Sequence, residues 1–284
     1  MKLLSFRHQG REFYGIVDGD KVVDLAPLAA ELGADLRGLL ASGKLAGLKG
    51  RDLSALPRLA LADIEFLPVI PNPEKIFCVG INYLSHVLET GNTVPKFPMI
   101  FTRFADSQAG HLQPMIRPLV SEMFDFEGEL AVIIGKSSRH IKAADALAHV
   151  AGYSCYNDGS VRDWQRRTSQ FIPGKNFPFT GGFGPWLVTT DDIPDPSKLK
   201  LQTRLNGQVV QDASTDDLIF PIATLVEYCS DFTNLYPGDV IITGTTGGVG
   251  WARTPPLWMK HGDTVEVEIS GIGVLRNPVA DEKA

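Results

Sequence analysis

Alternation of hydrophobic and polar positions predicts β-strands near both ends of the chain. In the first part, the ranges 2–6, 13–17 and 22–25 carry this pattern, and the turn Asp18-Gly19-Asp20 joins the last two into a hairpin. Further strands, most of them bounded by Gly or Pro, are predicted at 76–79, 130–134, 240–243, 264–269 and 274–276. Strands therefore predominate in the predicted secondary structure.

Helical spacing of apolar residues is less frequent. It predicts helices at 25–32, 36–45, 83–90, 143–149 and 222–232. The chain holds 28 glycines and 19 prolines among 284 residues without any repeat, which is typical of many short elements joined by turns. These patterns predict a mainly β chain of the α+β class.

Three prolines between Pro68 and Pro73 interrupt the pattern. Proline fixes φ and lacks an amide hydrogen, so this segment cannot continue a helix or a central strand. We therefore predict a domain boundary here, with a small N-terminal α+β domain at 1–70 and a larger domain at 71–284.

Composition excludes several classes of protein. Hydrophobic residues make up 44% and charged residues 21% of the chain, as in ordinary globular domains. The net charge is −6 without a basic block, which argues against nucleic-acid binding, and the apolar runs are too short to span a membrane. No signal-peptide core precedes Arg7, and Cys78, Cys155 and Cys229 are too scattered for a disulfide framework. We expect a cytoplasmic protein with free thiols.

Two glutamates directly precede the apolar strand predicted at 130–134. Strand alternation places Glu127 and Glu129 on one face, with Cβ atoms roughly 6.5 Å apart at two strand rises. The same spacing also occurs at solvated strand ends, but the apolar continuation favours burial, and two buried carboxylates require a cation between them. Asp158 is a third candidate ligand, and Asp125 shares the strand parity as a further or supporting acid. Oxygen ligands favour Mg²⁺ or Mn²⁺ over zinc.

A second candidate group is a histidine with a carboxylate three residues later. His86 and Glu89 lie on one face of the predicted helix 83–90, where a carboxylate can hold an imidazole and raise its basicity. An exposed His–Glu pair is the alternative interpretation. Arg162 suits a planar carboxylate through its two parallel N–H donors. Arg166 and Arg167 are expected to be solvated.

The glycine-rich stretch 243–250 invites a nucleotide-binding interpretation, which fails. It lacks the Lys-Ser/Thr ending of a phosphate-binding loop, and Pro255 and Pro256 prevent the helix that would follow. We expect instead a turn that brings backbone amides and Thr245 to a ligand.

Several motifs occur in a familiar order between residues 75 and 279: Gly80-Ile81-Asn82-Tyr83 followed by His86 and Glu89, Phe126-Glu127-Gly128-Glu129, Asn157-Asp158, Gly174-Lys175-Asn176-Phe177, and Thr243-Gly244-Thr245. In these motifs the chain resembles the fumarylacetoacetate hydrolase superfamily, in its small acylpyruvase-like branch. Residues 1–66 match only loosely. The chain departs from the pattern at Gly159, at Val161 and at Thr246-Gly247, where Pro-Ala is usual.

The resemblance implies a mixed β-roll, a homodimer and a Mg²⁺ or Mn²⁺ cofactor. It implies hydrolysis of a carbon–carbon bond in a 2,4-diketo acid (an acylpyruvate), giving pyruvate and a carboxylic acid. The implied residues are Glu127, Glu129 and Asp158 for the metal, His86, Glu89 and Lys175 for catalysis, and Arg162, Gln165 and Thr245 for the 2-oxo acid substrate.

Three alternatives stay open. The same site could isomerise or decarboxylate an unsaturated 2-oxo dicarboxylic acid, or act as a lyase of the ureidoglycolate type. A metal-stabilised binding protein without activity is the third, although such a protein has no need of the His86–Glu89 pair.

Overall fold

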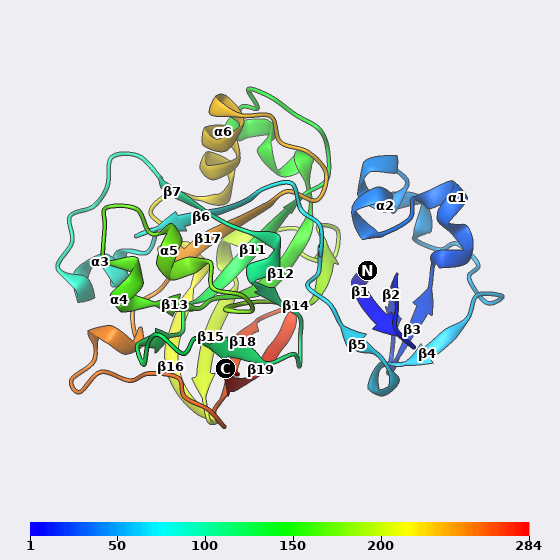
Figure 1. Cartoon of the computed structure of the whole chain (residues 1–284). Helices are drawn as coiled ribbons and strands as arrows, with labels where there is room; N and C mark the ends of the chain where they lie inside the picture. Colours follow the sequence, from blue (N-terminus) through cyan, green and yellow to red (C-terminus); the bar gives the residue numbers. More distant parts are fainter. Residues whose placement is uncertain (284) are drawn as a thin grey trace.

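The computed structural model describes residues 1–283, and its strands form one large twisted sheet with smaller sheets packed beside it (Figure 1). The N-terminal part is a small antiparallel unit with two short helices: β1 (Lys2–His8), β2 (Arg11–Asp18), β3 (Lys21–Asp24), α1 (Ala29–Leu32), α2 (Leu36–Ser42), β4 (Arg58–Ala60) and β5 (Glu65–Phe66). The hairpin and the helices predicted here are present, the first helix beginning as a short 3-10 turn at Ala26–Leu28.

The middle of the large sheet carries the longest buried strands. They and their neighbours are β6 (Ile76–Gly80), β7 (Met99–Arg103), β8 (Gln108–Ala109), β11 (Gly128–Ile134), β12 (Val150–Asp158), β14 (Gly181–Thr189) and β17 (Val240–Thr245). The order across the sheet is β4-β3-β2-β1-β14-β12-β11-β17-β6-β7, with β5 paired to β1 and β8 to β14. The predicted boundary between residues 70 and 71 stays a prediction, since β1 continues the sheet through its pairing with β14.

A second sheet of five strands packs beside the first. Its strands, in spatial order, are β16 (Gln208–Ser214), β15 (Lys200–Leu205), β18 (Thr264–Ile269), β19 (Gly273–Asp281) and β9 (Met115–Arg117). A short pair, β10 (Phe124–Asp125) with β13 (Ser160–Val161), lies near the ends of β11 and β12. The remaining helices are α3 (Leu84–Thr90), α4 (Arg162–Gln165), α5 (Ile172–Lys175) and α6 (Ile222–Phe232), together with a 3-10 helix at Ala143–His149.

Strand β11 shows why the range 130–134 is apolar at every position. Leu130 and Val132 face a core that includes strands of the second sheet and α6, whereas Ala131 and Ile133 face a second core that includes α2. Because both faces of this strand are covered, neither needs polar side chains, and its sequence is a continuous hydrophobic run. The mixed-sheet α+β fold that we predicted is thus confirmed.

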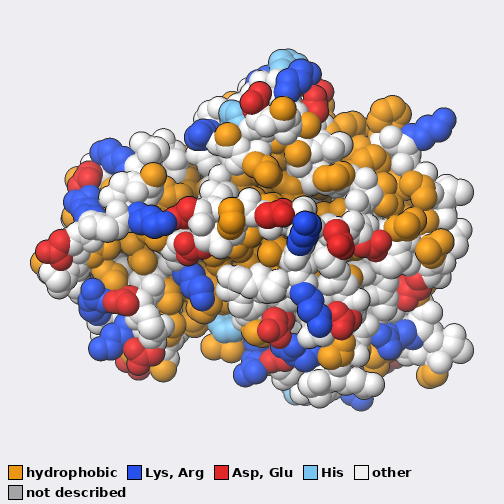
Figure 2. All heavy atoms as spheres, turned by 180° about the vertical axis from the view of Figure 1, so that it is seen from behind, with side chains coloured by type: hydrophobic (Ala, Val, Ile, Leu, Met, Phe, Trp, Pro, Cys, Tyr) orange, Lys and Arg blue, Asp and Glu red, His pale blue; other side chains and the backbone are white. Residues whose placement is uncertain are grey.

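The outer surface carries both charged and apolar side chains. Figure 2 shows the face opposite to that of Figure 1, where hydrophobic side chains gather most densely on the right-hand part among charges of both signs. The predicted homodimer stays a prediction. Within residues 1–283, no helix has the length and apolar character needed to cross a membrane.

Gly159, next to one of the predicted metal ligands, has no room for a side chain. A Cβ atom there would lie 2.1 Å from the Thr180 carbonyl oxygen and 2.7 Å from the Met115 methyl carbon. We expect Gly159→Ala to lower the free energy of unfolding by about 1–3 kcal/mol through overpacking, measured by urea denaturation. Gly47→Ala is the matched control, because a Cβ at Gly47 meets nothing within 4 Å. Equal losses in both variants would contradict this account.

Candidate active site

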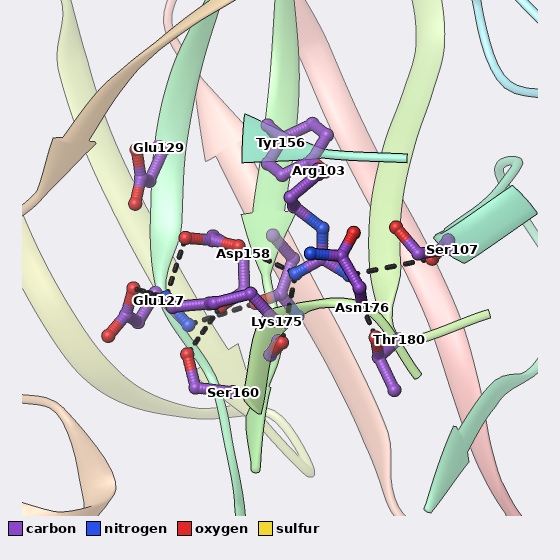
Figure 3. Close-up of polar contacts among 12 residues, drawn as sticks. Arg103, Ser107, Glu127, Glu129, Tyr156, Asp158, Ser160, Lys175, Asn176 and Thr180 are labelled. Atoms are coloured by element: carbon purple, nitrogen blue, oxygen red, sulfur yellow. Dashed lines mark hydrogen bonds and ion pairs between the residues drawn. The ribbon is translucent and has the colours of Figure 1, made fainter. Parts of the chain in front are cut away.

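Three buried carboxylates meet where β11 and β12 pair. One oxygen from each of Glu127, Glu129 and Asp158 lies within 4.8 Å of the others, and all three residues are at most 6% exposed. The pairing brings them together, because Glu129 lies opposite Tyr156 and the Asp158 amide donates to the Glu127 carbonyl at 2.8 Å. Figure 3 shows the three side chains turned toward one another. The same-face arrangement of the two glutamates, predicted from strand parity, is present.

Two of these carboxylates are held by buried cations. Lys175 Nζ lies 2.7 Å from Glu127 Oε2 and 2.6 Å from Asp158 Oδ2, between the two side chains (Figure 3). Arg103 pairs with Asp158 at 2.6 Å, and Arg162 pairs with Glu127 at 2.6 Å. Burial opposes ionisation of Glu127, but the charges of Arg162 and Lys175 outweigh it and lower its pKa. Arg103 has no counterpart among the sequence predictions.

Glu129 differs from its two neighbours, because no cationic side chain within residues 1–283 forms an ion pair with it. Its carboxylate accepts a 2.5 Å hydrogen bond from the Gly244 amide. Burial and the negative charges of Asp158 and Glu127 raise the pKa of Glu129. A divalent cation among the three carboxylates would supply the missing positive charge, and the all-oxygen donor set fits a hard ion such as Mg²⁺ or Mn²⁺.

Asp125 lies outside this group of three. Its carboxylate accepts from the amides of Gly250 at 2.8 Å and Trp251 at 3.1 Å, and it pairs with Arg162 at 2.8 Å. Since Arg162 reaches on to Glu127, Asp125 orients the arginine rather than joining the three carboxylates.

His86 faces the site from α3, and Glu89 lies beside it on the same helix. His86 is 8% exposed, and its Nδ1 lies 3.5 Å from Glu89 Oε2, which is too long for a well-formed hydrogen bond. Both carboxylate oxygens of Glu89 accept from the Gly248 amide, at 2.9 and 3.0 Å. Burial opposes ionisation of Glu89, but His86 and this amide outweigh it and lower the pKa. His86 is thus buried, whereas its partner Glu89 lies at an exposed position of α3.

The glycine-rich segment that runs from the end of β17 into the following loop binds acids of the protein itself. The amides of Gly244, Gly248 and Gly250 donate to Glu129, Glu89 and Asp125 respectively. Gly248 must be glycine, because its φ is +97° and a Cβ would lie 2.2 Å from the Val210 carbonyl oxygen. These three amides are thus engaged within the protein, and our expectation that this loop contacts a ligand stays a prediction.

One cavity of about 250 Å³ collects the predicted side chains. Eight of the nine predicted residues line it, and only Glu89 does not. The eight are His86, Glu127, Glu129, Asp158, Arg162, Gln165, Lys175 and Thr245. The Thr245 hydroxyl donates to the Gly128 carbonyl at 3.0 Å and accepts from Gln211 at 2.9 Å, so it is already engaged within the protein. Phe101, Phe171 and Trp251 add aromatic walls that sequence reasoning missed.

Residues 75–280 match the family described as the fumarylacetoacetate (FAA) hydrolase C-terminal domain. The chain belongs to the fumarylacetoacetate hydrolase family. It is 41% identical over 290 residues to a mitochondrial oxaloacetate tautomerase of Homo sapiens, an alignment that covers 98% of this chain and 91% of that protein.

Solved structures of other family members have the same fold. The fumarylacetoacetate hydrolase of Exiguobacterium antarcticum is similar with a TM-score of 0.88 and 34% identity, over 99% of this chain and 100% of that one. Maleylpyruvate hydrolase from Sphingobium sp. SYK-6, solved with manganese(II) and pyruvate, has a TM-score of 0.84 and 28% identity over the whole of both chains. The chain is thus an enzyme of a superfamily that includes tautomerases and hydrolases.

Glu129 offers a test of the metal site. We expect Mn²⁺ to raise the melting temperature, because a ligand at 100 times its Kd stabilises the folded state by about 2.7 kcal/mol. Glu129→Gln keeps the shape but loses a charged ligand, so this rise should largely disappear. Glu122→Gln removes an equal charge from an exposed position and should leave it intact. The measurement is thermal unfolding of each variant with and without Mn²⁺. If Mn²⁺ raised the melting temperature of Glu129→Gln as much as that of the wild type, Glu129 would not be a metal ligand.

Proposed function

We propose that this enzyme uses a divalent metal to interconvert the keto and enol forms of a 2-oxo acid, with oxaloacetate as the first substrate to test. The supporting observation is that one small cavity joins a buried histidine, which can move a proton, to positive groups beside three carboxylates. The identity of 41% with an oxaloacetate tautomerase across 98% of the chain supports the same choice.

The reaction requires only proton transfers. A proton leaves C3 of the substrate and another is added to the 2-oxo oxygen, with no other bond broken. His86 takes the C3 proton, and Glu89, fixed by the Gly248 amide, places a carboxylate 3.5 Å from the imidazole Nδ1. Lys175, poised between Glu127 and Asp158, stabilises negative charge that develops on the oxygen.

Glu127, Glu129 and Asp158 are the residues that would hold the metal, which when bound would act as a Lewis acid toward the 2-oxo oxygen. Arg162 and Gln165 form one side of the cavity, where Arg162 donates to the Gln165 amide oxygen at 2.9 Å. Held in this way, the two residues provide a rigid polar surface for the substrate carboxylate.

Hydrolysis of an acylpyruvate is a second candidate, favoured by the buried histidine–carboxylate pair and by the likeness to a maleylpyruvate hydrolase. There His86 would take a proton from water, whose oxygen bonds to the C4 carbonyl carbon. The C3–C4 bond breaks, C3 takes up a proton, and pyruvate and a carboxylic acid leave. This route needs a water molecule beside His86, whereas tautomerisation does not.

The two candidates give different products. With Mn²⁺ or Mg²⁺ bound, the enzyme should speed the decay of freshly dissolved enol-oxaloacetate, followed by the ultraviolet absorbance of the enol. Acetylpyruvate should yield little pyruvate in a coupled assay. Pyruvate release from acetylpyruvate without faster enol decay would instead establish the hydrolase, and pyruvate with CO₂ from oxaloacetate would establish a decarboxylase.

His86 is the residue on which both candidates depend. We expect His86→Ala to lower kcat roughly 10²- to 10⁴-fold, the usual contribution of general acid–base catalysis. Stabilisation by Mn²⁺ should stay as in the wild type, because the imidazole is not one of the three carboxylate ligands. An unchanged kcat in the purified, metal-loaded variant would remove His86 from the reaction.

A further inference from the structure

Arg166 follows α4 directly and lies at the wall of the catalytic cavity. The sequence led us to expect a solvated side chain, and the residue is indeed exposed. Its guanidinium, however, lies 3.9 Å from the centroid of the Trp251 ring, another residue of the cavity wall. Such stacking holds a cation in place without neutralising its charge.

Among the cationic side chains that line the cavity, Arg166 alone has no anionic partner within residues 1–283. Lys175 is paired with Glu127 and Asp158, and Arg162 with Asp125 and Glu127. Partial burial and the positive charge of Arg162 lower the pKa of Arg166. An anion beside this guanidinium would relieve that electrostatic cost.

Trp251, on which Arg166 stacks, is itself fixed to the site. The Trp251 amide donates to Asp125, and Asp125 pairs with Arg162, which reaches Glu127. Arg166 is therefore held in a defined relation to the three carboxylates, as a group that recognises one end of a ligand must be.

Charge at the cavity points to a ligand with two negative charges. Three lining carboxylates, Glu127, Glu129 and Asp158, carry −3, and three lining cations, Arg162, Arg166 and Lys175, carry +3. A divalent ion at the carboxylates would leave an excess of +2. A dicarboxylate ligand matches that excess, whereas a monocarboxylate leaves one positive charge unmatched.

We propose that Arg166 binds the distal carboxylate of a 2-oxo dicarboxylic acid and so determines the preference of the enzyme for dicarboxylates. The inference rests on the proposed function, which places the other end of this acid, with its 2-oxo group, toward the three carboxylates. The planar guanidinium can give two parallel N–H donors to a carboxylate while it stays stacked on the indole.

Arg167 provides a matched control. It is the next residue, it carries the same side chain, and its guanidinium lies 3.6 Å from the centroid of the Trp164 ring. Neither Arg167 nor Trp164 lines the cavity. R166Q and R167Q thus remove equal charges from stacked arginines that differ in their access to the site.

The first measurement is equilibrium binding by calorimetry with Mn²⁺ present. L-Malate and L-lactate are unreactive 2-hydroxy acids that differ by the distal carboxylate. We expect R166Q to weaken malate binding roughly 10- to 100-fold, as for loss of a hydrogen bond between charged groups, and lactate binding less than threefold. R167Q should change neither, and R166K should retain part of the preference because it keeps the charge without the planar pair of donors.

The second measurement is enolisation of oxaloacetate and of its 4-methyl ester. R166Q should lose the preference for oxaloacetate mainly through KM, while kcat for the ester stays near that of the wild type. Any one of three results would overturn the inference. R166Q could weaken malate and lactate binding equally, R167Q could have the same effects as R166Q, or the wild-type enzyme could bind malate no tighter than lactate. Malate binding that depends on Arg166 in an enzyme without tautomerase activity would support the inference while rejecting the proposed function.

Discussion

The balance of buried charge is the constraint on which the site depends. Glu127, Glu129 and Asp158 are nearly inaccessible to solvent, and removing one partner of a buried ion pair generally costs about 3–5 kcal/mol. Lys175 offsets part of this charge by bridging Glu127 and Asp158. Glu129 has only a backbone amide, so the protein leaves room for one further cation at this point. The unmatched charge indicates where a metal belongs.

Backbone amides complete this balance from one loop. In the segment from the end of β17 to residue 250, the amide of Gly244 donates to Glu129, that of Gly248 to Glu89 and that of Gly250 to Asp125. One loop thereby positions a candidate metal ligand, the acid beside His86 and the acid that orients Arg162. Gly244 and Gly248 both have positive φ, so glycine makes these amides available where other residues would be strained. Changes in this loop would therefore alter the three carboxylates and the surroundings of His86 together.

Much of this arrangement was accessible from the sequence. Strand parity placed Glu127 and Glu129 on one face, and helical spacing placed His86 near Glu89, because both periodicities act over a few residues. Resemblance to the family then brought in distant residues such as Gln165 and Lys175. The roles suggested for them stay predictions, although the cavity brings nearly all of them together.

The features that sequence reasoning missed are of two kinds. Strand β12 was overlooked because its nine residues are all buried and mix Gly, Tyr, Ser and Asn, which leaves neither alternation nor an apolar run. The anchoring of Glu89 by Gly248 and the stacking of Arg166 on Trp251 join residues far apart in the chain. No local pattern encodes such contacts, although the run of glycines in the loop was a visible sign that backbone amides would be used.

The two parts of the site differ in how firmly the fold holds them. The three carboxylates lie at the paired ends of β11 and β12, where a one-residue change in register would move Glu129 to the opposite face of the strand and disrupt two cores. His86, Arg162 and Arg166 lie on or beside helices of four to seven residues, which depend on neighbouring loops for their position. Substitutions can accumulate in these short elements at little cost to the sheet. A fixed group of acids combined with an adjustable wall explains how relatives of one fold include both a tautomerase and a hydrolase. Under the proposed function, the acids would determine which functional group of the substrate is activated, and the residues of the cavity wall would determine where the proton moves and which substrate is held.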